Sequence, residues 1–149
     1  MKLFFFALLL SFNVFASEEL NAELKQKDAN YTSLKEHYAT LATHVKAKDA
    51  EKFCACVKKS RKALDQIFAD DQELMKVLRS FENEDYVDYA QHIEDNIYSP
   101  LFSYTAYTDM CQRARYESIF GLTISLQLHA VNVDYLKLSN LLFWQSVSN

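Results

Sequence analysis

A long stripe of apolar residues at alternating spacings of three and four runs through the first third of the chain. It comprises Leu20, Leu24, Tyr31, Leu34, Tyr38, Leu41 and Val45, with Lys27 at its one missing step. This spacing places the stripe on one face of a helix and predicts a helix over residues 18–48. The stripe can pack in the chain's own core, which is the preferred interpretation, or form a homodimer through Leu24–Val45.

Capping residues predict three more helices further along. Asp49 is a suitable N-cap for a second helix, and Asp70 with Glu73 has the spacing of a capping box for a third. Asn83 would cap a fourth helix that ends near Tyr98. The inward face of the second helix would carry Phe53, Cys56, Val57, Ser60, Leu64 and Ile67.

The C-terminal segment is ambiguous between strand and helix. Apolar and polar residues alternate from Leu122 to His129, which is typical of a strand, but a lone strand leaves its backbone groups unsatisfied. Read as a helix to about Ser146, the segment is apolar on all sides. We therefore predict a central helix buried by its neighbours. A short helix starting at Ser99 and Pro100 would come before it.

Glycine and proline are nearly absent, with one of each in 149 residues. Turn-rich β folds need many more of both, so the chain is predicted to be all-α. We expect a single bundle of five or six helices, with a long N-terminal helix, an apolar C-terminal helix and one disulfide.

The N-terminus has the pattern of a secretory signal peptide. Lys2 precedes an apolar run, and Val14 and Ala16 are small residues suited to a cleavage site after Ala16. The run is shorter than the roughly 20 residues that cross a bilayer, so no stable membrane insertion is expected after cleavage. The expected product is one domain, residues 17–149, in the periplasm or outside the cell.

Charge is acidic overall but unevenly distributed. The formal net charge is −4, which argues against binding nucleic acid. Four basic residues cluster on the outward side of the second predicted helix and are candidates for binding a charged protein partner: Lys58, Lys59, Arg61 and Lys62. The alternative is that they are only a solvated face.

Three cysteines predict one disulfide in an oxidising compartment. Cys54 and Cys56 are too close along a helix to pair with each other, so Cys111 is expected to bond to one of them. Cys56 is preferred because both it and Cys111 fall on apolar faces. Cys54 is then a free thiol, or the alternative partner. Three cysteines could also serve thiol–disulfide exchange, although there is no C-x-x-C motif.

Other chemistry has little support in the sequence. No nucleophile elbow, zinc-protease motif or phosphate-binding loop is present, and no metal ligands are spaced for one ion. We predict no enzyme activity, cofactor or metal. Four aromatic residues could line a ligand pocket: Tyr104, Tyr107, Tyr135 and Trp144. A haem would need His129 with Met75 or Met110 as its axial pair.

Three functional hypotheses follow. The preferred one is an exported, non-enzymatic protein that binds another protein, such as a periplasmic inhibitor that neutralises a toxin, or a chaperone-like factor. The second is a bundle that binds a ligand or cofactor. The third is a thiol redox protein that uses Cys54, Cys56 and Cys111.

Overall fold

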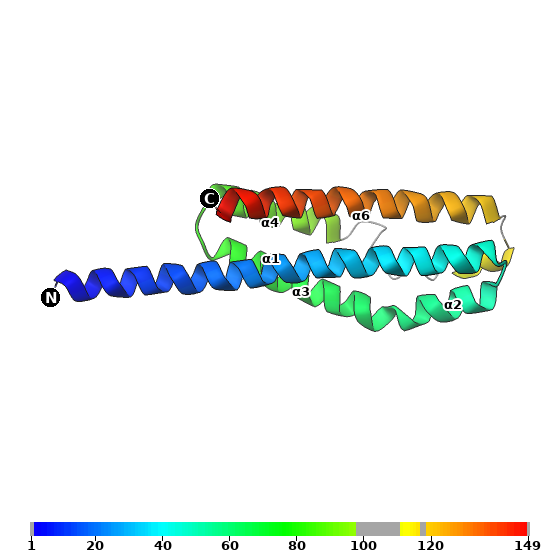
Figure 1. Cartoon of the computed structure of the whole chain (residues 1–149), viewed down its shortest axis with the longest axis horizontal. Coiled ribbons are helices and arrows are strands. Elements are labelled where there is room, and N and C mark those ends of the chain that lie inside the picture. The colour runs from blue at the N-terminus through cyan, green and yellow to red at the C-terminus, as the bar shows by residue number, and fades with distance from the viewer. Residues whose placement is uncertain (1, 98–110, 117–118, 149) are drawn as a thin grey trace.

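The computed structural model describes the backbone of residues 2–97, 111–116 and 119–148, and the side chains of 17–96, 111–116 and 121–148 (Figure 1). Its helices are α1 (Lys2–Lys46), α2 (Ala50–Lys59), α3 (Arg61–Arg79), α4 (Glu84–Ile97) and α6 (Ile119–Ser148), and residues 111–116 are also helical. The predicted all-α bundle, with its long N-terminal helix, apolar C-terminal helix and one disulfide, is confirmed. The short helix predicted after Pro100 lies outside the described residues.

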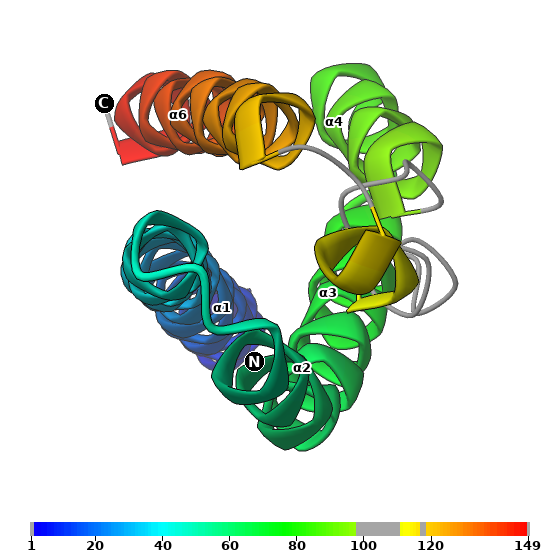
Figure 2. The same cartoon turned by 90° about the vertical axis from the view of Figure 1, so that its right-hand side faces the viewer.

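The helices are arranged around a common core. Viewed along the bundle, α1, α3, α4 and α6 surround its centre, and α2 continues the line of α3 (Figure 2). α1 packs against α2, α3 and α6, and α3 packs against α4. The N-terminal end of α1 projects beyond the other helices (Figure 1). The ambiguous C-terminal segment is a helix, and it lies along α1.

Two of the three predicted helix starts are confirmed. The Asp49 carboxylate accepts a hydrogen bond from the Lys52 amide at 3.0 Å, and Asn83 Oδ1 accepts one from the Asp85 amide at 2.9 Å. The predicted start at Asp70 is wrong, because α3 runs through it without interruption. The break instead falls at Ser60, whose hydroxyl bonds back to the Cys56 carbonyl, a contact that tends to bend helices.

The long stripe on α1 lies in the chain's own core. Residues 31–45 of the stripe join one apolar cluster with α2, the start of α3 and the first half of α6. Leu20 and Leu24 join a second cluster with the end of α3 and with α4. The preferred interpretation, packing within one chain, is confirmed by this burial. The members of the stripe are at most 5% exposed in the single chain.

A buried polar layer separates the two apolar clusters. Lys27 Nζ donates to Asp71 Oδ1 at 2.6 Å, and both side chains are about 5% exposed. Asn30 Nδ2 donates to Asp70 Oδ2 at 2.9 Å. These contacts join α1 to α3 in one register, because a slip of either helix would leave buried charges unpaired. They also explain why Asp70 does not cap a helix.

Candidate functional site

α6 carries a buried stripe that packs on the rest of the bundle. Its fully buried members are Leu122, Leu126, Val133, Leu136 and Asn140. These residues follow helical spacings of three, four and seven, and therefore lie on one side of α6. One side of α6 is thus fully used in the core.

The opposite side of α6 carries a second apolar stripe, which we call the outer stripe. Its members are Ile124 (40% exposed), Leu128 (59%), Val131 (63%), Tyr135 (64%), Leu138 (53%) and Leu142 (56%). They recur at spacings of four and three over almost three heptads, which is the pattern of a coiled-coil seam. The prediction of a central, fully buried helix is therefore wrong. α6 has apolar residues on all sides, but neighbouring helices cover only one side.

The charged residues of α6 point towards α1 and not onto the outer stripe. The described side chains of α6 include only two from Asp, Glu, Lys and Arg, namely Asp134 and Lys137. Asp134 forms an ion pair with Lys35 of α1. Lys137 donates to the Thr32 hydroxyl at 2.8 Å and lies 3.8 Å from Asp28. The outer stripe therefore presents apolar surface with no charged residue among its members.

Buried hydrogen bonds set the rotation of α6 about its axis. Asn140 donates to the Leu24 carbonyl at 3.1 Å and accepts from the Tyr89 hydroxyl at 2.9 Å. Burial raises the pKa of Tyr89 well above its ordinary value, so the phenol stays a donor. Ser139 lies 3.2 Å from His92 Nε2. Because the opposite side is tied in this way, the outer stripe is held facing outward.

Comparison with known proteins supplies no function. No protein-family model matches the chain, and neither does a curated protein or a solved structure. Binding is therefore inferred from the side chains themselves. Of the ten large apolar residues that are exposed in the described part of the chain, seven lie on α6. Exposed apolar patches of this extent on small proteins mark interaction sites more often than isolated exposed residues do.

The predicted basic cluster lies where α2 meets α3. Lys58, Lys59, Arg61 and Lys62 are all exposed around the bend at Ser60. They lie on α2 and α3, whereas the outer stripe lies on α6. The four basic residues therefore form a candidate surface separate from the outer stripe.

The disulfide joins Cys54 to Cys111, with their Cα atoms 5.0 Å apart. The preferred pairing of Cys56 with Cys111 is wrong, and the alternative partner Cys54 is correct. Two residues along a helix correspond to a turn of about 200°, so the two thiols face different neighbours. Cys54 faces the helical residues 111–116, whereas Cys56 faces α1, with its sulfur 3.9 Å from His37 Nδ1.

Cys56 is the free thiol and lines a small pocket between α1, α2 and α3. The pocket has a volume of about 270 Å³ and is also lined by Leu34, His37, Ser60 and Ile67. The Ser60 hydroxyl lies 2.9 Å from His37 Nδ1. Burial raises the pKa of the Cys56 thiol, although Lys59 opposes this, and burial lowers the pKa of His37. Both groups are therefore neutral near pH 7, and the thiol is not activated.

We expect Cys56 to react slowly with a chromogenic disulfide reagent in the folded protein. At pH 8 the rate should be lower than that in 6 M guanidinium, because the raised pKa leaves less thiolate. The rate should level off at a higher pH than the rate of an exposed thiol does. Lys59→Ala should slow it further, since that charge favours the thiolate. Equal rates for folded and unfolded protein would contradict this.

The proposed ligand residues do not converge. Tyr104, Tyr107 and Met110 lie outside the described residues. Tyr135 and Trp144 are nine residues apart, which places them on opposite sides of α6. Tyr135 belongs to the outer stripe, whereas the Trp144 indole donates to Asn21 of α1 at 3.0 Å.

The other axial residues considered for haem are also in separate places. His129 stacks on Tyr38 with ring centroids 5.7 Å apart, within reach of the first apolar cluster. Met75 is buried in the second cluster. In the described part of the chain, no group of three or more His, Cys, Asp or Glu side chains is placed to hold a metal ion.

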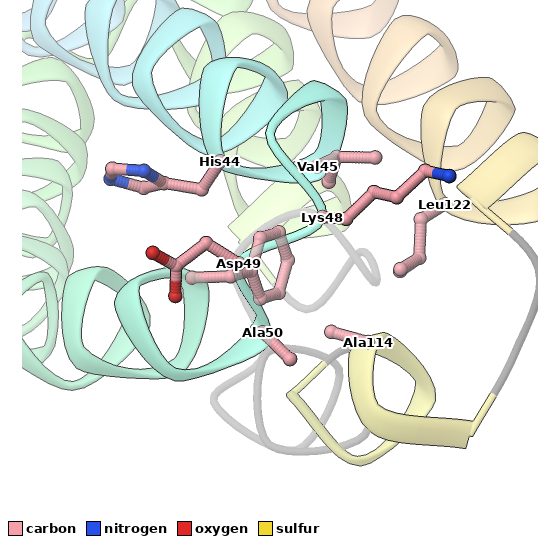
Figure 3. Close-up of a pocket in the computed structure, with 8 residues that line it drawn as sticks. His44, Val45, Lys48, Asp49, Ala50, Ala114 and Leu122 are labelled. Carbon is pink, nitrogen blue, oxygen red and sulfur yellow. The ribbon is translucent and has the colours of Figure 1, made fainter.

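A further pocket lies at the end of the bundle where α1 turns into α2 (Figure 3). Its lining residues come from three places in the sequence: His44, Val45, Lys48, Asp49, Ala50, Phe53, Ala114 and Leu122. The volume is about 80 Å³, far below the roughly 300–1,000 Å³ of typical small-molecule sites. This pocket is large enough for a few waters at most.

Proposed function

We propose that this protein is exported and acts, without catalysing a reaction, by binding another protein through the outer stripe of α6. The observation that carries the proposal is the set of six exposed apolar residues at heptad spacing. An apolar stripe of this kind is the binding face of helices that dock on other helices or in grooves. The buried stripe on the other side shows that the exposure is not needed to complete the chain's own core.

Export is supported by the N-terminal sequence and by the lengths of the helices. Cleavage after Ala16 would remove 15 of the 45 residues of α1 and leave a helix of 30, the length of α6. The part removed coincides with the end of α1 that projects beyond the bundle (Figure 1). A disulfide that joins distant segments also suits an oxidising compartment. No described helix is long and apolar enough to cross a membrane.

A small helical protein of this kind could neutralise an incoming toxin or hold a partly folded client. Either role needs a stable scaffold that presents one binding face, and neither needs a catalytic group. The alternatives receive less support. Two of the three thiols form the disulfide, and the third, in a pocket of about 270 Å³, is not activated.

Capture from the native host tests the proposal. The full chain with a C-terminal tag would be co-expressed with the untagged chain, and all captured proteins, including the untagged copy, would be identified by mass spectrometry. We expect Leu128→Glu to reduce capture of the specific partner at least about tenfold, because a buried carboxylate at the centre of an apolar interface costs several kcal/mol. Val87→Glu, at an exposed apolar residue of α4, is the matched control and should capture normally.

The same assay examines the basic cluster. Replacing Lys58, Lys59 and Arg61 together by Glu should weaken capture and flatten its salt dependence if this cluster steers a charged partner. Unchanged capture would leave the cluster as a solvated face. The proposed function is refuted if the wild type captures no protein, or if Leu128→Glu captures every protein as well as the wild type does.

A further inference from the structure

The spacing of the outer stripe is the same in both directions along α6. Its positions are spaced four, three, four, three and four, so they are symmetric about the point between Val131 and Tyr135. In an antiparallel pair of α6 helices, Ile124 would therefore face Leu142, Leu128 would face Leu138, and Val131 would face Tyr135. All six positions find an apolar partner without any gap or shift in register.

We propose that the protein bound by the outer stripe is a second copy of this chain, in an antiparallel pairing of the two α6 helices. This inference rests on the proposed function and names its partner. A two-fold axis would pass between Val131 and Tyr135, and each contact would occur twice, as in any isologous dimer. The seam would be about 27 Å long, at 1.5 Å per residue from Ile124 to Leu142.

The exposed area is adequate for a stable dimer. Applying the exposed fractions to ordinary side-chain areas, and including the neighbouring Leu141, gives roughly 600 Å² per protomer, near the ~800 Å² per partner of a standard interface. Alternating contacts between apolar side chains at heptad spacing supply the knobs-into-holes packing that such an interface needs. Counted over both protomers, this area is larger than that of most crystal-packing contacts.

The charges beside the outer stripe also allow the pairing. The residues that would flank the seam are Ser125, Gln127, Asn132, Asp134, Ser139 and Leu141. Asp134 is the one acidic or basic residue among them, and its ion pair with Lys35 provides the compensating charge where the two copies of Asp134 would approach. No array of like charges therefore opposes association.

A lipid surface fits the outer stripe less well than a second copy does. Helices that lie in a membrane interface are rich in Lys and Arg on their polar face. The single Lys or Arg in the described part of α6, Lys137, is already engaged with Thr32 and Asp28 of α1. The outer stripe also has the spacing of a helix–helix seam along its whole length.

Sedimentation velocity of purified residues 17–149 between 1 and 100 µM tests the dimer. We expect dimers with a Kd of about 10 µM or tighter. Leu128→Glu should weaken association at least about 100-fold, and Val87→Glu should leave it unchanged. Circular dichroism of each variant would confirm that it is folded. A wild-type monomer at 100 µM would overturn the inference, while leaving stripe-dependent capture of a different protein, and hence the proposed function, intact.

A charge swap tests the antiparallel direction. In the proposed dimer residue 128 faces residue 138 of the partner, so Leu128→Glu combined with Leu138→Lys should restore at least about tenfold of the lost affinity by pairing opposite charges. In a parallel dimer each substituted residue would face its own copy, and the combination would associate more weakly than either single variant. That result would overturn the antiparallel arrangement.

Flotation with vesicles of phosphatidylethanolamine and phosphatidylglycerol tests whether lipid binds the outer stripe. If the protein is monomeric and Leu128→Glu abolishes its flotation, lipid occupies the outer stripe and the second-copy inference is wrong. If the dimer forms and the vesicles do not bind the protein, the inference stands. Both arms use the same purified variants.

Discussion

Replacing both Cys54 and Cys111 by Ala is expected to lower the free energy of unfolding by about 4 kcal/mol. The bond spans a sequence separation of 57, and in the chain-entropy model closing a loop of this length restricts the unfolded chain by that amount. Small domains have total stabilities of only about 5–15 kcal/mol. Urea unfolding of residues 17–149, followed by circular dichroism at 222 nm, measures the change.

Cys56→Ala is the matched control for this measurement. Cys56 is partly buried and takes no part in the bond, so its loss should change stability far less than the loss of the pair. A single Cys54→Ala variant is also informative, because it leaves Cys56 and Cys111 able to pair only after α2 rotates. A double variant that unfolds at the same urea concentration as the wild type would contradict a stabilising role for the bond.

Lys27→Met should destabilise the protein by about 3–5 kcal/mol, because it leaves the Asp71 carboxylate buried without its partner. The polar layer between the two apolar clusters would then contain an uncompensated charge. Asp71→Leu combined with Lys27→Met should recover most of this loss, since apolar side chains of similar volume can replace a buried ion pair. Lys76→Met, which breaks the exposed pair with Glu73, should have little effect.

The pH dependence of the Lys27→Met variant gives an independent check. Burial already raises the pKa of Asp71 above 3.8 and the neighbouring Lys27 opposes this, so removing Lys27 should raise that pKa further. A carboxyl whose pKa is raised by folding favours the folded state at low pH, and this contribution is lost as the pH rises through the raised value. The variant should therefore be closest to wild-type stability near pH 4 and furthest from it at pH 8. A deficit that is constant with pH would contradict the explanation.

The helices were largely predictable, because they depend on local patterns. The stripe from Leu20 to Val45 and the caps at Asp49 and Asn83 each involve neighbours within a few residues, and each is found as predicted. The cap expected at Asp70 failed because contacts between α1 and α3 compete with the local one. Lys27 was visible as the polar step in an apolar stripe, but its partner 44 residues away was not.

The candidate site could not be predicted from the same patterns. Apolar residues on all sides of α6 do not indicate which side a neighbouring helix covers and which side stays exposed. The symmetric spacing from Ile124 to Leu142 was present in the sequence, and became informative once Val133 and Asn140 were known to face the core. The predicted pairing of Cys56 with Cys111 is wrong for a related reason. An apolar face indicates burial, but Cys56 is partly buried and lies against α1, not against residues 111–116.

The contacts between α1 and α6 also determine when the bundle can close during synthesis. The Asn140 side chain bonds to the Leu24 carbonyl across 116 residues, and Trp144 bonds to Asn21 across 123. The buried face of α1 is therefore covered only in part, by α2 and α3, until α6 has left the ribosome. Long-range closure of this kind is slow compared with helix formation. The bundle therefore stays incomplete until nearly the whole chain has been synthesised.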